Sequence, residues 1–419
     1  MRKILVVGAG QSGLQLALGL VAEDYDVTIA TLAGPEEVLA GGVRSTQCLF
    51  GPALRRERRH GLALWDGRAT GIEGVGVRVA DPGSTDPDLS WLGRLEEPAQ
   101  SVDQRVKMSA WMRLFDRNGG TLLRRRVTPG ELAETARDYD LVIVAAGREA
   151  LAELFPRDEG RSAFRTPQRR ITLAYVTGAE DDPRGPVLDR TSIIGAGEVF
   201  TLPTHSVAGP CHALMVEAVP GGPLDRPLGR EADGQEVLSA LLDVLRCHAP
   251  WHHERFTDAV PADRGATLHG SHTPVVREPV AHLADGTPVL GMADTVVSND
   301  PVTAQGANMA SLAADVHRRA IVDHGDRAFD ERFMRATFAE YWRYARQVTA
   351  WSEVMLTGPP HVWDLFGLAE RHQETADRFA DSFSDPTGLI DWFLHPERAS
   401  AYIDGVHRAE PRLLGHFAF

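Results

Sequence analysis

The sequence predicts an α/β fold with a parallel-sheet nucleotide-binding domain, an inserted β-rich substrate domain and C-terminal helices. Three observations support this prediction. Four apolar residues near the N-terminus run into the turn Gly8-Ala9-Gly10-Gln11-Ser12-Gly13. A second apolar run, residues 141–144, is followed closely by another glycine, Gly147. Far along the chain, residues 299–311 place a proline and then Gly-Ala-Asn directly before a helical pattern.

The N-terminal segment is the first element, a Rossmann-like βαβ unit. Residues 4–7 predict a buried strand, residues 14–21 a helix, and residues 27–30 a second parallel strand. The second strand ends at Thr31, where such units normally place an acidic residue on the adenosine ribose, although a hydroxyl can still bond a ribose. The turn alone leaves NAD(P), FAD and a purely structural role open. Because its glycines let the backbone approach a pyrophosphate, the candidate contacts are Gly8, Gly10, Gln11, Ser12 and Gly13.

The remaining patterns predict the domain boundaries. Gly, Asp, Pro and Ser alternate with apolar positions in residues 66–101, which is typical of strands and loops outside the nucleotide core. Short β-like segments fill the middle of the chain, and its C-terminal part is helical and rich in aromatic residues. We therefore expect a discontinuous cofactor domain (1–65, 102–160 and 280–326), a substrate-binding β domain (66–101 and 161–279) and a C-terminal helical region (327–419).

Composition excludes several classes of protein. A chain of 419 residues that is 43% hydrophobic can bury a large core. The 58 acidic residues exceed the 44 basic ones, and the net charge of −14 argues against a nucleic-acid or anionic-membrane partner. The three cysteines have no metal-type spacing, so we expect no metal site and a reducing cytoplasmic location. The first apolar run is too short for a secretory segment or a membrane span.

The segment 299–311 decides between the dinucleotides in favour of FAD. Its composition would serve no purpose in a dehydrogenase that transfers hydride from NAD(P), whereas backbone amides at a helix start can face an electron-rich flavin ring. A strand-like run just before it delivers Asp294 toward a ribityl chain. The residues expected near the isoalloxazine are Pro301, Gly306, Ala307, Asn308 and Met309.

These motifs resemble a known family, the FAD-dependent oxygenase components of two-component flavin monooxygenases, which are the styrene and indole monooxygenases. The resemblance runs nearly end to end and implies the aromatic-hydroxylase-like flavin monooxygenase fold. The matching motifs are Gly8-Ala9-Gly10-x-x-Gly13-Leu14, Val102-Asp103-x-Arg105, Tyr139-Asp140-Leu141-Val142-Ile143-Val144 with Gly147, and Asp300-Pro301-Val302-x-x-Gln305-Gly306-Ala307-Asn308-Met309-Ala310-Ser311.

The resemblance also favours the indole branch of that family over the styrene branch. Indole-preferring members resemble Ser-x-Gln-x-Met in the loop after the second strand, and this chain has Ser45-Thr46-Gln47-Cys48-Leu49, so that only Leu49 departs. The hydrogen-bonding groups of Ser45 and Gln47 suit a flat heteroaromatic with one N–H. The alternative is that both merely cap a local element. The candidate cavity and catalytic residues are Ser45, Gln47, Leu49, Ile72, Val75, Ala99 and Asn308.

The reaction and its partners follow from the same resemblance. The stretch Ala145-Ala146-Gly147-Arg148 lacks the aspartate of hydroxylases that bind NAD(P)H themselves, so a separate NAD(P)H-flavin reductase would supply reduced FAD. With O2 this gives a flavin C4a-hydroperoxide, which would epoxidise indole at C2=C3 toward indoxyl and indigo, with styrene and sulfides as side substrates. The alternatives are a styrene monooxygenase, a biosynthetic oxygenase of a larger indolic or vinyl-aromatic substrate, and a non-catalytic flavin-binding redox protein.

Two arginines and three histidines complete the candidates. We expect Arg105 near the pyrophosphate and Arg44 near the flavin or the cavity mouth, with a salt bridge as the alternative for each. His205, His252 and His253 have no accompanying carboxylate or metal-ligand spacing, so we assign them no role. A homodimer stays open.

Overall fold

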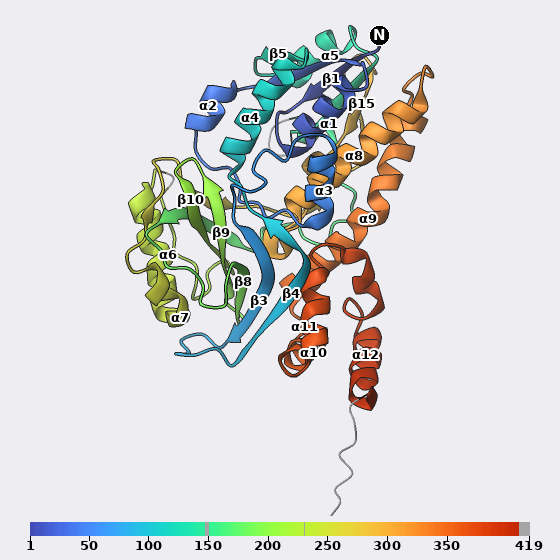
Figure 1. Ribbon diagram of the computed structural model, residues 1–419. Helices are drawn as coiled ribbons and strands as arrows, with labels where there is room; N and C mark the ends of the chain where they lie inside the picture. Colours follow the sequence, from blue (N-terminus) through green and yellow to red (C-terminus); the bar gives the residue numbers. More distant parts are fainter. Residues whose placement is uncertain (147–150, 230, 410–419) are drawn as a thin grey trace, which may run out of the picture.

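Two β-sheets organise the chain, and helices cover both of them (Figure 1). The structure is a computed structural model that describes residues 1–146, 151–229 and 231–409. The first sheet has six strands in the order β14-β15-β6-β1-β2-β5, and every neighbouring pair except β14 and β15 is parallel. This confirms the predicted α/β class with a Rossmann-like core. Its strands are β1 (Lys3–Val7), β2 (Asp26–Thr31), β5 (Thr121–Arg124), β6 (Leu141–Val144), β14 (Val280–His282) and β15 (Pro288–Gly291).

The helices of this half begin where the sequence supplies caps. Asp103 accepts a hydrogen bond from the amide of Arg105, and Thr128 forms a capping box with Glu131. The helices at 51–59 and 129–136 offer only short apolar patterns, which do not predict a helix from the sequence alone. The helices are α1 (Gln11–Val21), α2 (Pro35–Ala40), α3 (Gly51–Arg59), α4 (Gln104–Arg117), α5 (Pro129–Ala136) and α8 (Gly306–His324).

The second sheet has eight strands, in the order β11-β7-β10-β9-β8-β3-β4, with β12 also paired to β7. It is antiparallel except where β3 lies parallel to β8. Its strands are β3 (Gly71–Ala80), β4 (Leu89–Gln100), β7 (Arg170–Thr177), β8 (Val187–Ile193), β9 (Gly197–Ser206), β10 (Gly209–Ala218), β11 (Val260–Pro261) and β12 (Thr267–Ser271). Two short strands, β13 (Val275–Val276) and β16 (Val297–Ser298), pair with each other.

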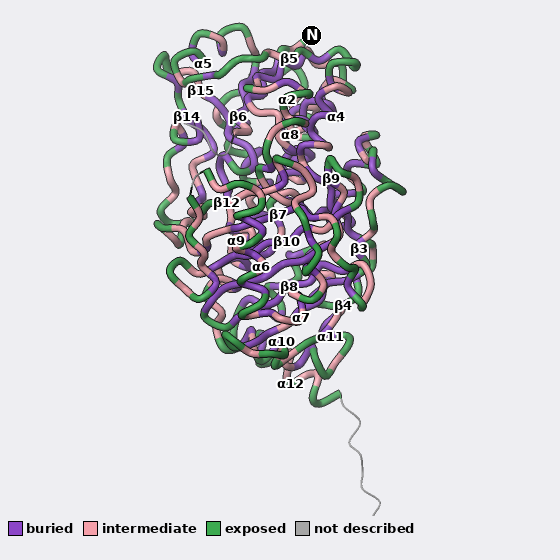
Figure 2. Tube along the Cα trace, turned by 90° about the vertical axis from the view of Figure 1, so that its left-hand side faces the viewer, coloured by how far each residue is buried: buried purple, intermediate pink, exposed green. Residues whose placement is uncertain are grey.

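Strands β7, β8, β9 and β10 in the middle of the second sheet are mostly buried, and Figure 2 shows much of their trace in purple. Side chains alternate along β7, so that Leu173 and Tyr175 join one apolar cluster while Ala174 and Val176 join another. Helices α6 (Gly234–His248) and α7 (Pro250–His253) cover the second cluster. The C-terminal helices α9 (Glu331–Thr357), α10 (Pro360–Arg371), α11 (Gln373–Asp381) and α12 (Pro396–Ala409) lie on the side of the first cluster. Short 3-10 helices are η1 (Ala152–Leu154), η2 (Glu254–Phe256), η3 (Ala293–Thr295), η4 (Pro301–Thr303) and η5 (Pro386–Asp391).

Residues 66–101, expected to form strands and loops outside the nucleotide core, form the long antiparallel pair β3 and β4 of the second sheet. The glycines that resemble loop signals lie where a neighbour approaches closely. A Cβ at Gly74 would lie 2.7 Å from the carbonyl oxygen of Gly93, and one at Gly76 would lie 2.6 Å from the guanidinium of Arg184. The domain boundaries stay a proposal, which the strand membership of the two sheets supports.

Candidate functional site

The glycine turn after β1 has a different use for each of its three glycines. Gly8 has φ +116°, and a Cβ there would lie 2.7 Å from the carbonyl oxygen of Ala145. A Cβ at Gly13 would lie 2.1 Å from the carbonyl oxygen of Gly8, so this glycine lets α1 pack against the strand. A Cβ at Gly10 would meet nothing within 4 Å. Gly10 therefore borders open space at the start of α1, which fits the pyrophosphate of a dinucleotide.

A second helix start lies at the same end of the molecule. The Nε2 of Gln15 in α1 donates to the carbonyl and hydroxyl oxygens of Ser311 in α8, at 3.3 and 3.2 Å. Further along both helices, Gly19 lies against the side chain of Arg318. The contact partner in α8 moves from Ser311 to Arg318 as the position in α1 moves from Gln15 to Gly19. The two helices therefore run in the same direction. The N-terminus of α8, at Gly306, also borders open space, so two helix dipoles direct their positive ends to one region.

A buried ion pair is hydrogen-bonded to the glycine turn through Gln11. The Nζ of Lys107 donates to both carboxylate oxygens of Glu57, at 2.7 and 3.0 Å, and each side chain is 1–2% exposed. The Nε2 of Gln11 donates to the same carboxylate at 3.0 Å. Helices α1, α3 and α4 are therefore held together at the turn. The side-chain amide of Gln11 points into the protein, and Ser12 is also buried. The groups of this turn that border the open space are therefore those of the backbone.

Asn308 fixes the loop of residues 45–50 to the start of α8. Its Oδ1 accepts from the backbone amide of Phe50 at 3.0 Å. Its Nδ2 donates to the carbonyl oxygens of Cys48 at 2.9 Å and Ala304 at 3.2 Å. The side chain amide is thus used in positioning the loop. Met309 beside it is buried, and its sulfur accepts from the Nδ2 of Asn299 at 3.2 Å.

The same loop lies along the end of β4. The Nε2 of Gln47 donates to the carbonyl oxygen of Val102 at 2.7 Å, and Leu49 pairs with Gln100 through two backbone hydrogen bonds. Ile72 faces Ala99 across β3 and β4. Together with Val75, these two join the apolar cluster that contains Cys48 and Phe50, while Leu49 packs with Ala53, Leu54 and Ala307. The structure therefore brings the predicted cavity residues into one region, with Ser45 half-buried at the entrance of the loop.

Arg105 has the structural salt bridge that was the alternative to a pyrophosphate contact. Its guanidinium donates to Asp103 at 2.7 and 2.9 Å, to Asp263 at 2.8 Å through two nitrogens, and to the carbonyl oxygen of Gly41 at 3.1 Å. The side chain is 4% exposed. Because Asp263 lies just before Gly265, whose carbonyl accepts from the amide of Val43, this cluster ties the second sheet to the loop.

The other predicted contacts lie at the rim of this region or outside it. Thr31 donates its hydroxyl to the carbonyl oxygen of Ala33 at 3.2 Å. Arg44 is exposed at the beginning of the loop, and Asp294 is exposed within η3. Gly147 lies outside the described residues.

A buried group of acidic residues lies next to Pro301, and no spacing in the sequence predicts it. The carboxylate of Asp300 accepts from the amide of Val302 at 3.2 Å, and the residue is 2% exposed. Burial raises the pKa of Asp300 to about 7. The charge of Glu198 adds to this increase, whereas the hydrogen bond from Val302 and the charge of Arg169 oppose it. Glu217 is fully buried, and neither of its oxygens has a hydrogen-bond partner among the described residues. Burial raises the pKa of Glu217 well above its ordinary value.

Two arginines complete this group, which we call the Asp300 network (Asp300, Glu198, Glu217, Arg169 and Arg190). Arg169 binds Glu198 through two hydrogen bonds of 2.7 and 3.0 Å, and Arg190 reaches the same carboxylate at 3.4 Å. Three carboxyl groups thus face two guanidinium groups. This balance favours at least one protonated carboxyl at neutral pH.

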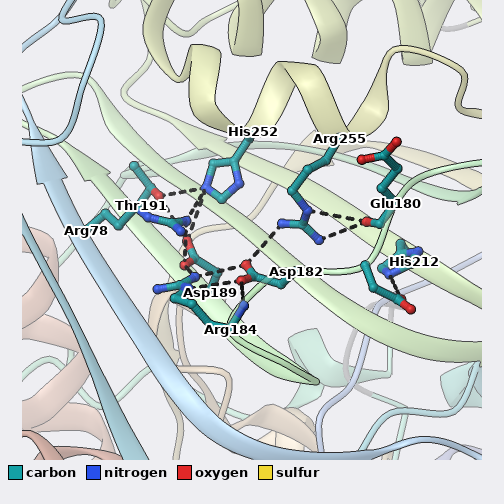
Figure 3. Close-up of polar contacts among 10 residues, drawn as sticks. Arg78, Glu180, Asp182, Arg184, Asp189, Thr191, His212, His252 and Arg255 are labelled. Carbon is teal, nitrogen blue, oxygen red and sulfur yellow. Dashed lines mark hydrogen bonds and ion pairs between the residues drawn. The ribbon is translucent and has the colours of Figure 1, made fainter.

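A second buried network lies in the β domain (Figure 3). We call it the Asp189 network, and its members are Arg78, Asp182, Arg184, Asp189, Thr191, His252 and Arg255. His252 contradicts the expectation that no carboxylate accompanies it, because its Nε2 lies 3.1 Å from Asp189. Nothing in the spacing of two residues so far apart in the chain signals this contact.

The arrangement around His252 is structural. The hydroxyl of Thr191, at 2.9 Å, and the carboxylate of Asp189 share the Nε2 of His252, whereas its Nδ1 has no partner within the described part of the chain. A proton relay would need a different partner on each ring nitrogen. Burial lowers the pKa of His252, so the ring stays neutral.

The described residues include neither a metal site nor a membrane-spanning helix. Over residues 1–146, 151–229 and 231–409, no group of histidine, cysteine and acidic side chains is arranged to hold a metal ion. Across the same residues, no helix combines the length and hydropathy needed to cross a bilayer.

The fold is shared with flavin-dependent proteins of known structure. A flavoprotein/dehydrogenase from Cytophaga hutchinsonii matches with a TM-score of 0.69 at 11% identity, covering 97% of this chain and 100% of that one. The flavin-dependent brominase Bmp2 matches with a TM-score of 0.68 at 13% identity, covering 97% and 99%. A variant of the halogenase PltM in complex with FAD matches with a TM-score of 0.63 at 13% identity, covering 97% and 95%. The fold is therefore that of flavin-dependent halogenases and oxidoreductases.

Sequence relatives define the family within this class. Styrene monooxygenase StyA of Pseudomonas fluorescens is 30% identical over 412 residues, which cover 95% of this chain and 96% of that protein. StyA of another Pseudomonas is equally similar. Residues 147–255 match the family described as "Styrene monooxygenase A putative substrate binding domain". The chain belongs to the styrene monooxygenase family, as its motifs had indicated.

Proposed function

We propose that this chain is an FAD-dependent monooxygenase that epoxidises an indole-like aromatic at its C2=C3 bond. Membership of the styrene monooxygenase family supports the oxygenase class. One atom supports the indole-like substrate. The Oε1 of Gln47 is buried and has no hydrogen-bond partner among the described residues, while Nε2 of the same amide donates to Val102. The amide orientation is thereby fixed with an acceptor left over, and an indole N–H would satisfy it.

FAD fits the residues at the two helix starts. Gly10 and Gly306 border open space, whereas Gly8 and Gly13 have their backbones in close contact. The amides at Gly10 and Gln11 would hold the pyrophosphate, Thr31 the ribose and Asp294 the ribityl chain. Pro301, Gly306 and Ala307 would border the isoalloxazine. Reduced FAD, supplied by a separate NAD(P)H-flavin reductase, would provide with O2 the oxygen atom that is transferred.

The protein residues orient the substrate and exclude water. Ile72, Val75 and Ala99 supply apolar walls, and Gln47 holds the ring nitrogen. Asn308 is a positioning residue, because it holds the backbone of Cys48 and Phe50 next to α8. Apolar walls would also admit styrene and sulfides as side substrates. Because its three cysteines are free, the protein suits a reducing cytoplasm.

The activity test combines purified protein, FAD, an unrelated flavin reductase, NADH and indole in air. We expect indole loss and blue pigment that depend on this chain. Gln47→Leu should lower the indole-to-styrene ratio of kcat/KM by about 3–10-fold, the value of one hydrogen bond, because the loss of the Val102 contact affects both substrates alike. The same change at the exposed Gln235 is the control. No oxidation of indole, styrene or thioanisole, with reduced FAD present, would leave a flavin-binding protein without oxygenase activity.

Cofactor binding is tested separately with the two glycines of contrasting surroundings. Gly10→Ala should fold normally and bind FAD at least about 10-fold more weakly, because the added methyl enters the space of the pyrophosphate. Gly13→Ala should destabilise the domain itself, since its Cβ meets the backbone of Gly8. Equal FAD affinity in wild type and Gly10→Ala, measured by equilibrium dialysis, would contradict the proposed location.

A styrene monooxygenase and an oxygenase of a larger indolic or vinyl-aromatic substrate are the remaining candidates. The family relatives support the first of these. Relative kcat/KM values for indole and styrene distinguish a styrene monooxygenase from the indole monooxygenase that we propose. Only the indole monooxygenase requires that Gln47→Leu lower kcat/KM for indole more than for styrene.

A further inference from the structure

A buried tyrosine faces the loop of residues 45–49 without a use for its hydroxyl. Tyr175 lies in β7, is fully buried, and belongs to the same apolar cluster as Cys48 and Phe50. Its backbone is satisfied, because its amide donates to Ala266 and its carbonyl accepts from Ala262. Its phenolic oxygen has no aligned hydrogen-bond partner among the residues that the structure describes. A buried tyrosine hydroxyl usually has a partner, so this one requires an explanation.

A second hydroxyl in the same condition lies beside it. The Oγ1 of Thr46 is buried and also has no aligned partner in the described residues. It is close enough to the Tyr175 phenol to act on its pKa, which burial raises far above the ordinary value. The phenol is therefore neutral and keeps its proton as a donor. Asp103, whose charge also acts on Tyr175, follows directly after Val102, the residue that holds Gln47.

The groups around this position cannot satisfy the hydroxyls from within. Asp103 and Arg105 face Tyr175, but both are used in their own ion pair and in the contacts to Asp263. If the hydroxyls of Tyr175 and Thr46 rotated to bond each other, one hydroxyl hydrogen and the Oε1 of Gln47 would still lack partners. Leaving such groups buried without a hydrogen bond destabilises the protein. A ligand with polar atoms would remove this cost.

We infer that Tyr175 and Thr46, with Gln47, form the polar end of the substrate site and select aromatic alkenes that carry a ring N–H or a hydroxyl. The Oε1 of Gln47 or one of the two hydroxyl oxygens accepts from the ring N–H, and a hydroxyl can donate only to an oxygen that the substrate carries, because the ring nitrogen of an indole has no free lone pair. Plain hydrocarbons of the same shape leave these three groups unpaired. This inference rests on the proposed function, because it names the substrate class of that same site.

The test compares indole with indene, a hydrocarbon of nearly the same shape that has CH2 in place of N–H. Binding of each is measured by calorimetry on the full chain with FAD present, and turnover is measured from the product ratio of an equimolar mixture. Tyr175→Phe and Thr46→Val each remove one hydroxyl with little change of volume. The control is Tyr402→Phe, because Tyr402 bonds Thr375 among the C-terminal helices, far in sequence from this loop.

We expect the wild type to prefer indole and each cavity variant to lower the indole-to-indene ratio by about 3–10-fold, mainly through weaker indole binding. The Tyr402→Phe ratio should equal that of the wild type. An unchanged ratio in both Tyr175→Phe and Thr46→Val would overturn the inference, and the two hydroxyls would then bond only each other or a structural water. Calorimetry keeps the two proposals apart, since an indole preference that depends on Tyr175 without any turnover supports the binding site and contradicts the oxygenase.

Discussion

The Asp189 network and the Asp300 network are both buried in contact with the second sheet, yet their charges are balanced in opposite ways. Around Asp189, two aspartates face three arginines and a neutral histidine, and both carboxylates accept hydrogen bonds. Around Asp300, three carboxyl groups face two arginines, and Glu217 has no partner among the described residues. Carboxylates that are all paired with arginines stabilise a fold, whereas the unpaired acid next to Pro301 indicates a protonated carboxyl beside the proposed flavin site.

The largest effect is expected from removing the central carboxylate of the Asp189 network. Asp189→Asn leaves Arg78 and Arg184 buried without their shared carboxylate, and we expect it to lower the free energy of unfolding by about 3–5 kcal/mol. Circular dichroism during urea denaturation measures this loss. Asp243→Asn, which breaks an exposed pair with Arg246, is the control and should leave the midpoint unchanged. A midpoint shift no larger than that of the control would show that the Asp189 network contributes little.

The pH dependence of stability should differ in sign between the networks. The folded pKa of Asp300 is about 7, above its ordinary value of 3.8, so the native state holds a proton that the unfolded chain has lost. Stability therefore falls as pH rises from about 4 to about 7 through this residue. The lowered pKa of Asp189 acts oppositely, because its contribution is lost as pH falls below the ordinary value.

Unfolding free energies of wild type and Asp300→Asn across this range isolate the effect. His317, whose pKa burial lowers to about 4, makes stability fall as pH decreases over a similar range. It is common to both proteins, so the difference between the two curves belongs to Asp300 and to Glu217, whose pKa the charge of Asp300 also raises. We expect that difference to change in favour of the variant as pH rises. Parallel curves would show that Asp300 is ionised when folded.

A smaller effect is expected at the loop of residues 45–50, which the start of α8 holds in place. Asn308→Ala removes one acceptor and two donor contacts, and we expect a loss of about 1–3 kcal/mol together with faster proteolysis in residues 45–50. The exposed Asn118→Ala is the matched control. Unchanged proteolysis of the loop in Asn308→Ala would mean that β4 alone holds it in place.

The smallest change sharpens the comparison. Glu217→Gln replaces an acid that already holds its proton with a neutral amide of similar shape, so the free energy of unfolding should stay within about 1 kcal/mol at neutral pH. Urea denaturation measures it beside Asp189→Asn. A loss as large as that of Asp189→Asn would mean that Glu217 is an ionised partner of Arg169 or Arg190.

The sequence predicts local units well because their signals are local. The Gly8 to Gly13 turn and the segment from Asp300 to Asn308 identify the two helix starts, since a strand, a glycine turn and a helix follow one another in the chain. The candidate cavity residues come from family resemblance, and the loop that carries Gln47 and Leu49 lies along the end of β4 in the structure. Tyr175 lacks any such signal, because an aromatic residue in a β-like run predicts a core position, and only the fold reveals that its hydroxyl faces Thr46.

The same limit applies to the buried charges. The partners of Asp189 and Glu198 lie on separate strands and loops, and no spacing along the chain relates His252 to Asp189. The salt bridge of Arg105 joins Asp103 to Asp263, which also lie far apart in sequence. Pairings of this kind depend on the register of an antiparallel sheet, which a single sequence does not fix.

The parallel packing of α1 and α8 has a consequence for synthesis on the ribosome. The two helix starts that would border the cofactor come from residues 10 and 306, and Gln15 reaches Ser311 only when α8 is in place. A nascent chain that has emerged only as far as the second sheet therefore has only one of the two helix starts. It cannot yet hold a flavin between them. Cofactor capture is accordingly a late event, which follows the emergence of nearly three quarters of the polypeptide.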